Sequence, residues 1–159
     1  MNPDVIFAIS PYSWSAIGSA IICGIIIGLE RQLRGKPIGI RTSSLIVLGT
    51  YIFVASSMAV ATSITDPSRI IGQVVTGIGF LGAGVMLTRE GVVVGVTSAA
   101  SIWALAALGV CIAVIDNVTA IKLSLVVVAI LYGVDMLEEY SSILSRGVHS
   151  KYRNWREKG

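Results

Sequence analysis

The chain has 159 residues, of which 54% are hydrophobic and only 13% charged, with a formal net charge of +3. A soluble globular domain carries about 25% charged residues, so the composition excludes an ordinary soluble protein and indicates one that lies in a membrane. Its apolar runs are continuous and do not alternate in polarity, which excludes a transmembrane β-barrel and leaves α-helices.

Charged residues divide the sequence into apolar runs of the length that a membrane helix needs. A hydrocarbon core of about 30 Å requires about 20 helical residues. Five runs qualify, and the fifth is interrupted only by Lys122 near its start. We therefore predict an all-α bundle with five transmembrane helices, at 13–29, 42–61, 69–88, 98–115 and 118–137. Residues 1–140 then form one membrane domain and 141–159 a short basic tail.

The basic residues predict the orientation of the bundle. Ten Lys and Arg residues lie on the side that holds the first loop, the third loop and the tail, against two on the other side. By the positive-inside rule this places the C-terminus in the cytoplasm and the N-terminus outside. No Lys or Arg precedes the first span, so we expect it to stay attached and not to be a cleaved signal peptide. The tail is expected to anchor at anionic lipid, not nucleic acid.

The first predicted span carries small residues at every fourth position, ending in Gly24 and Gly28. Such a ridge lets a second helix backbone approach closely. Glu30 follows at the membrane edge, with Arg31 beside it and Arg34 one turn away. Two interpretations are equally open: a basic loop with one compensating acid, or a buried counter-ion at Glu30 that holds the loop against the helix ends.

The third predicted span begins with a marked capping sequence. Asp66 suits the N-cap and Pro67 the first helical position, and Arg69 and Gln73 follow near the face of Asp66. We expect Asp66 and Arg69 to pair near the outer interface. Gln73, one turn deeper, needs a partner on a neighbouring helix. Structural bonding between helices is the favoured interpretation, and an entry point for an ion or proton is the alternative.

Gly77, Gly79 and Gly82 satisfy the G-x-G-x-x-G spacing of a dinucleotide-binding turn, but no βαβ unit or suitably placed acid accompanies them. We interpret these glycines, with Gly84, as packing surfaces on two faces of a helix. Two neighbours could then grip this helix at once, which places it at the centre of the bundle. The alternative is a broken helix that exposes carbonyl groups to a cation.

The fourth predicted span opens with hydroxyl side chains, including Thr97, which either cap the helix or line a cytoplasmic mouth. Trp103 suits an interfacial belt. Cys23 and Cys111 lie inside spans, where we expect packed thiols and no disulfide. The sequence offers no zinc ligand set and no nucleophile with a base, so we expect neither an enzyme nor a cofactor.

Three motifs in one order resemble the membrane domain of the MgtC/SapB family of bacterial inner-membrane proteins: GLERQLRGKPIGIRT, DPSRIIGQVVTGIGFLGAGV and GVTSAASIWALAALG. The resemblance covers 13–135. The family motif residues carried by this sequence are Glu30, Arg31, Arg41, Thr42, Asp66, Arg69, Gln73, Gly77, Gly79, Gly82, Gly84, Gly95, Thr97 and Trp103. Some members follow the membrane domain with a cytoplasmic ACT-like domain. We expect this sequence to lack that domain, and therefore to lack any regulation through it. Thr97 stands where some virulence-associated members have Asn.

The resemblance implies a role in survival at low magnesium and, in pathogens, in life inside host cells. It further implies a mode of action, inhibition of the F-type ATP synthase through its membrane sector. We therefore expect a regulator that docks its helices against another membrane complex. The alternative is an oligomeric channel or carrier for magnesium or protons, at least a homodimer, with Asp66, Arg69 and Gln73 at its outer entry and Glu30 at its inner one.

Overall fold

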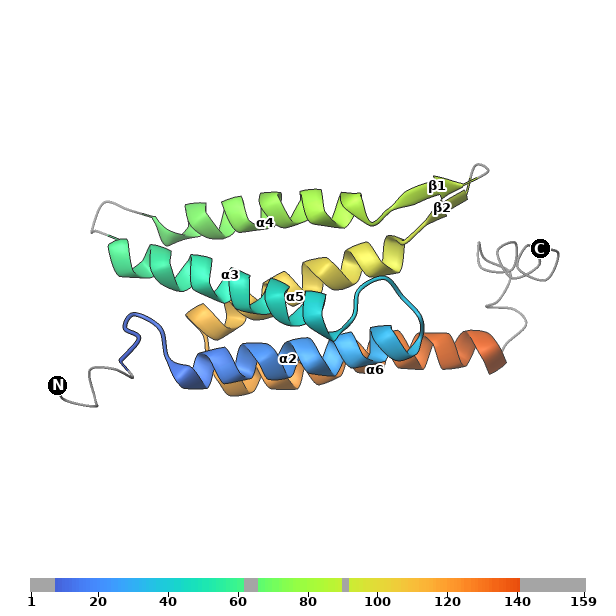
Figure 1. Cartoon of the computed structure of the whole chain (residues 1–159), viewed down its shortest axis with the longest axis horizontal. Coiled ribbons are helices and arrows are strands. Elements are labelled where there is room, and N and C mark those ends of the chain that lie inside the picture. The colour runs from blue at the N-terminus through green and yellow to red at the C-terminus, as the bar shows by residue number, and fades with distance from the viewer. Residues whose placement is uncertain (1–7, 62–65, 90–91, 141–159) are drawn as a thin grey trace.

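The computed structural model describes residues 8–61, 66–89 and 92–140. Within these ranges the chain forms five helices and one hairpin (Figure 1). They are α2 (Trp14–Leu33), α3 (Ile40–Val60), α4 (Pro67–Gly84), β1 (Leu87–Arg89), β2 (Val92–Val94), α5 (Val96–Val114) and α6 (Asn117–Tyr140). The predicted all-α fold is confirmed, and every helix begins and ends within four residues of its predicted bounds.

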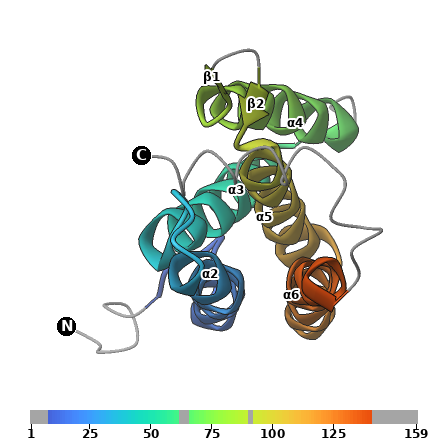
Figure 2. The ribbon, with the colours of Figure 1, turned by 90° about the vertical axis from the view of Figure 1, so that its right-hand side faces the viewer.

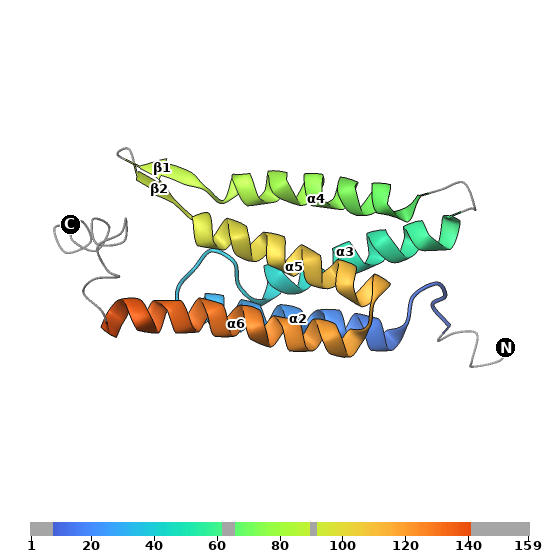
Figure 3. The same ribbon diagram turned by 180° about the vertical axis from the view of Figure 1, so that it is seen from behind.

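The helices form three layers, seen end-on in Figure 2. Helices α3 and α5 make the middle layer, α4 covers one side of it, and α2 with α6 covers the other. Seen from behind, α6 runs alongside α2 (Figure 3). The core lies where α2, α3 and α5 meet, at side chains such as Ile27, Val47 and Leu105 that are fully buried. Cys23 and Cys111 are buried there as free thiols, as predicted.

Glycines bring the core helices into backbone contact. A methyl group built at Gly28 of α2 would lie 2.6 Å from Ile40 Cα in α3, and one at Gly24 would collide with the backbone of Ser44. A methyl group at Gly109 of α5 would lie 2.6 Å from the Val47 carbonyl oxygen of α3. Helices α2, α3 and α5 can therefore approach this closely only because these positions have no side chain.

Helix α4 lies at the edge of the bundle, so its predicted central position is wrong within one chain (Figure 2). Of the α4 residues whose exposure is described, only Gly82 is buried. A methyl group built at Gly82 would make ordinary contact with Ala99 of α5. Apart from the adjoining residues and the nearby backbone of α4 itself, no atom of the described residues lies within 4 Å of a methyl group built at Gly77, Gly79 or Gly84. The physical reason is that α3 and α5 contact each other directly through Gly109, which leaves no space for α4 between them.

The connection from α4 to α5, predicted as a loop, contains a short antiparallel hairpin. Its register pairs Leu87 with Val94 and Thr88 with Val93. β-Branched residues such as Val92, Val93 and Val94 favour strands, and α4 ends at Gly84, four residues before the predicted limit. Gly95 then takes a φ of +92°, and a side chain there would collide with the Val85 carbonyl oxygen. Glycine is therefore required at the start of α5.

Four of the described helices, α2, α3, α5 and α6, are long and apolar enough to cross a membrane. Helix α4 is not among them, because Arg69, Gln73 and five glycines lower the hydropathy of its 18 residues. It nevertheless begins where α3 ends and finishes where α5 begins, at opposite ends of the bundle (Figure 1). If α3 and α5 cross the bilayer, α4 must cross it as well.

Candidate functional site

Charged side chains gather at the C-terminal end of α2. The Glu30 and Arg31 side chains are 8% and 1% exposed. Arg31 donates to both carboxylate oxygens of Glu30, from Nε to Oε2 and from Nη2 to Oε1, the latter at 2.8 Å. Arg34 Nε lies 2.8 Å from Glu30 Oε1, because α2 continues to Leu33 and places Arg34 one turn on. The structure therefore supports the interpretation of Glu30 as a buried counter-ion.

This arginine cluster, Glu30 with Arg31 and Arg34, also reaches α6. The Arg34 guanidinium carbon lies 5.2 Å from the centre of the Tyr132 ring, a distance at which a cation and an aromatic face attract by about 0.5–1 kcal/mol when exposed. Sequence reasoning missed Tyr132, and a tyrosine inside an otherwise apolar run was the available signal. Two arginines surround one carboxylate, so the cluster carries a net positive charge.

A groove between α3 and α4 brings together the predicted residues Arg41, Thr42, Gln73 and Gly77. Its volume is about 670 Å³. The rest of the lining is apolar apart from Thr50: Leu45, Ile46, Gly49, Thr50 and Phe53 from α3, and Ile70, Val74, Ile78 and Leu81 from α4. Arg41 lies at one end of the groove and Gln73 towards the other, because α3 and α4 are antiparallel. The Gln73 side chain is exposed, and within the described ranges it forms no hydrogen bond to a neighbouring helix.

Asp66 and Arg69 lie at the opposite end of the bundle from the arginine cluster. Asp66 caps α4, as predicted, and its Oδ1 accepts a hydrogen bond of 2.9 Å from the Ser68 backbone N–H. This bonding at Ser68, with a smaller contribution from the Arg69 charge, holds the pKa of Asp66 below its usual value. Both side chains are exposed, and they do not reach ion-pair distance, so the predicted pair is not formed.

Thr97 and Trp103 are both exposed on α5 and do not join either group of predicted residues. The Ser101 hydroxyl donates to the Thr97 carbonyl oxygen at 2.8 Å, and the N-cap of α5 is Gly95, without a side-chain bond. The predicted hydroxyl cap is therefore absent at this described helix start. Trp103 borders α4, where it lines a small cavity with Val74 and Ile78.

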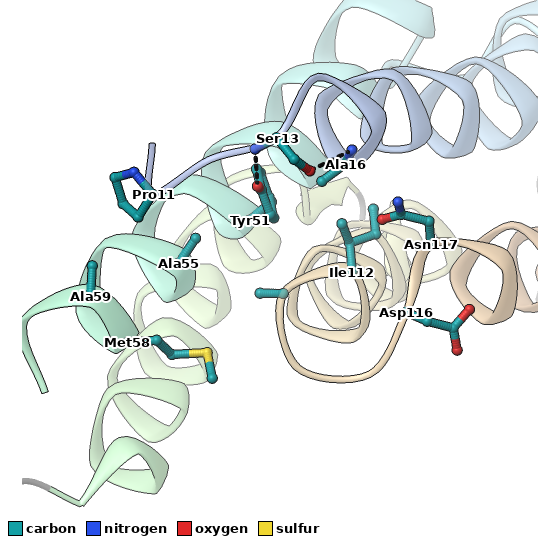
Figure 4. A pocket seen from close by; sticks show the side chains of 11 residues that line it. Pro11, Ser13, Ala16, Tyr51, Ala55, Met58, Ala59, Ile112, Asp116 and Asn117 are labelled. Atoms are coloured by element: carbon teal, nitrogen blue, oxygen red, sulfur yellow. Dashed lines mark hydrogen bonds between the residues drawn. The ribbon is translucent and has the colours of Figure 1, made fainter. Parts of the chain in front are cut away.

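A second cavity, of about 490 Å³, opens at the end of the bundle remote from the arginine cluster (Figure 4). Tyr51 of α3 projects into it and its hydroxyl accepts a hydrogen bond of 3.1 Å from the Ser13 N–H. Asp116 lies at its rim, where hydrogen bonds from Thr119 hold the pKa of Asp116 below its usual value. No predicted site residue lines this cavity. A polar residue within an apolar run, such as Tyr51, was the feature of the sequence that could have indicated it.

The fold, with four helices long and apolar enough to cross a membrane, defines a multi-pass helical membrane protein. The model of the MgtC family matches residues 17–140, so the chain belongs to the MgtC family, as the resemblance implied. This membership places the protein in the bacterial inner membrane. No solved structure matches the chain.

Three relatives illustrate the similarity. "Putative magnesium transporter YhiD" of Escherichia coli K12 is 48% identical over 101 residues, 59% of this chain and 46% of that protein. "Protein MgtC" of Salmonella typhimurium LT2 is 47% identical over 93 residues, 58% of this chain and 39% of that protein. An uncharacterized protein of Haemophilus influenzae is 36% identical over 169 aligned positions, which cover 99% of this chain and 65% of that protein. The chain thus matches between about two fifths and two thirds of the length of these relatives.

Proposed function

We propose that this protein is a membrane regulator linked to magnesium homeostasis, and that it acts by docking α4 against another membrane complex. The membrane sector of the F-type ATP synthase is the partner we propose, and low-magnesium adaptation is the setting. Membership of the MgtC family supports the link to magnesium, since the Escherichia coli relative carries the name "Putative magnesium transporter YhiD".

The docking proposal rests on the glycines of α4 that have free space around them. Four of its five glycines, Gly72, Gly77, Gly79 and Gly84, have no atom of the described residues within 4 Å of an added methyl group. A glycine in a helix interior costs about 1 kcal/mol relative to alanine. Among the described residues no close helix contact at these four positions offsets that cost, whereas close approach of a second helix would. Phe80, 81% exposed on the same helix, offers a large apolar side chain to such a partner.

The alternative is an oligomeric channel or transporter for magnesium or protons, and the name of the Escherichia coli relative favours it. It requires Glu30 to serve a cation at the inner entry. Glu30 is already bound by Arg31 and Arg34, and the positive cluster that results repels a divalent cation. Docking therefore agrees better with the charges.

The experiment measures ATP hydrolysis by energised inverted inner-membrane vesicles at matched ATP synthase content, with and without this protein. We expect a lower rate that persists after an uncoupler is added. Gly79→Leu should abolish the inhibition by filling the docking face. Gly133→Leu is the matched control, because Gly133 of α6 is also a helical glycine with free space around it, and it should leave inhibition intact.

A higher hydrolysis rate that the uncoupler cannot raise further would show that the protein leaks charge, and the docking proposal would have to be withdrawn. Equal inhibition by the wild type and Gly79→Leu would remove α4 from the mechanism even if the ATP synthase is the target.

A further inference from the structure

The groove between α3 and α4 combines an apolar length with a cation at one end. Arg41 is the second residue of α3, a helix long and apolar enough to cross a membrane. If α3 spans the bilayer, Arg41 lies at one of its surfaces, where the lipid phosphates are. Its side chain is exposed and forms no ion pair within the described ranges. Arg41 thus presents a positive charge, unpaired among the described residues, at one end of a groove whose remaining lining is uncharged and mostly apolar.

The start of α3 adds backbone donors to that charge. Gly39 at the N-cap supplies no side-chain acceptor, and the Ile40 N–H is satisfied by Gln32 Oε1 at 3.2 Å. The next two N–H groups, of Arg41 and Thr42, have no partner among the described residues. A helix N-terminus with free N–H groups favours an anion. These N–H groups belong to Arg41 and Thr42, whose exposed side chains also line the groove, so backbone and side-chain donors lie at the same end of it.

The length of the groove matches one leaflet of a bilayer. From Arg41 to Phe53 the α3 lining extends about 18 Å at 1.5 Å per residue. Half of a hydrocarbon core about 30 Å thick is about 15 Å. An acyl chain that hangs from a headgroup at Arg41 would therefore end near Phe53. Gln73, the polar residue of the α4 lining, lies towards that far end and away from the headgroup.

We propose that this groove binds one anionic phospholipid, with its phosphate at Arg41 and Thr42 and an acyl chain along the α3–α4 seam. Leu45, Gly77 and Leu81 would contact the chain. The charge at a single end identifies the occupant as amphipathic and anionic. The proposal does not depend on docking to a partner. Of the four α4 glycines with free space only Gly77 lines the groove, whereas Gly79 and Phe80 are outside its lining.

The test is thermal unfolding of the purified full chain in mixed micelles that contain either phosphatidylglycerol or phosphatidylcholine at equal mole fraction. A ligand at ten times its Kd should raise Tm by roughly 3–6 °C. We expect that rise with phosphatidylglycerol and a much smaller one with phosphatidylcholine. Arg41→Gln should remove the difference between the two lipids. Lys36→Gln, which removes an exposed charge at the same end but outside the groove lining, should keep it.

A second pair of variants tests the acyl chain. Gly77 lines the groove and a Cβ atom built there meets nothing within 4 Å, so Gly77→Leu should occupy the groove and reduce the rise in Tm, whereas Gly133→Leu should not. Equal stabilisation by the two lipids, or equal losses in Arg41→Gln and Lys36→Gln, would overturn the proposal in favour of a diffuse effect of the basic surface. A full rise with inorganic phosphate alone, unaffected by Gly77→Leu, would overturn it in favour of a simple anion site.

Discussion

Helices α2 and α4 both carry glycines at helical spacing, yet they use them differently. In α2, the α3 backbone occupies the space beside Gly24 and Gly28, and only Gly18 has free space around it. In α4, four of five glycines have free space. The same sequence pattern therefore forms a contact inside the chain in one helix and leaves a surface in the other. Only the presence of a facing helix distinguishes the two cases.

The largest effect should come from the charged end of α2. Glu30→Ala leaves Arg31, 1% exposed, without its carboxylate, and removing one partner of a buried pair costs about 3–5 kcal/mol. Thermal unfolding in detergent should show a fall in Tm of roughly 10 °C. An unchanged Tm would show that the ion pair does not hold α2 in place.

Gly28→Ala comes next and tests the contact in α2. The added methyl group would lie 2.6 Å from Ile40 Cα, so α2 and α3 must move apart. Overpacking of this kind costs about 1–3 kcal/mol. Gly18→Ala, on the same helix but with free space, is the control and should not destabilise the protein. Equal losses of stability in the two variants would contradict the close α2–α3 approach.

Gly79→Ala tests the opposite case in α4. Because free space surrounds Gly79, alanine should stabilise the isolated protein by up to about 1 kcal/mol through helix propensity alone. Chemical unfolding of the purified protein in detergent measures this gain. A loss of stability would mean that α4 already packs its glycines within the protein, and the comparison with α2 would fail.

The smallest effect concerns the cap of α4. The folded-state pKa of Asp66 is lowered by its hydrogen bonding at Ser68, so its stabilising effect is present above the ordinary carboxyl pKa, about 3.9, and is lost as the pH falls through the lower, folded-state value. Over this acidic range the Tm of the wild type should fall slightly more than that of Asp66→Asn. Identical pH profiles would exclude a contribution from the charge.

The helices could be predicted from the sequence because apolar runs, capping residues and basic loops are local features, which can be recognised without knowing which helices pack together. Asp66 at an N-cap and Arg34 one turn after Glu30 depend only on helical spacing. The position of α4 could not be predicted, because GxxxG spacing shows that a helix can be approached but not which helix approaches it. The contact of Arg34 with Tyr132 and the groove between Arg41 and Gln73 were missed for the same reason, since each joins residues from different helices.

Cross-linking from α4 tests the docking claim most directly. Gly79→Cys and Gly133→Cys would each be placed in otherwise wild-type protein, whose own Cys23 and Cys111 are buried, in membranes that contain the ATP synthase. We expect a short thiol-reactive cross-linker to join position 79, but not position 133, to subunits of the synthase membrane sector. Equal yields from both positions, or no product from position 79 in membranes where hydrolysis is inhibited, would contradict the docking claim.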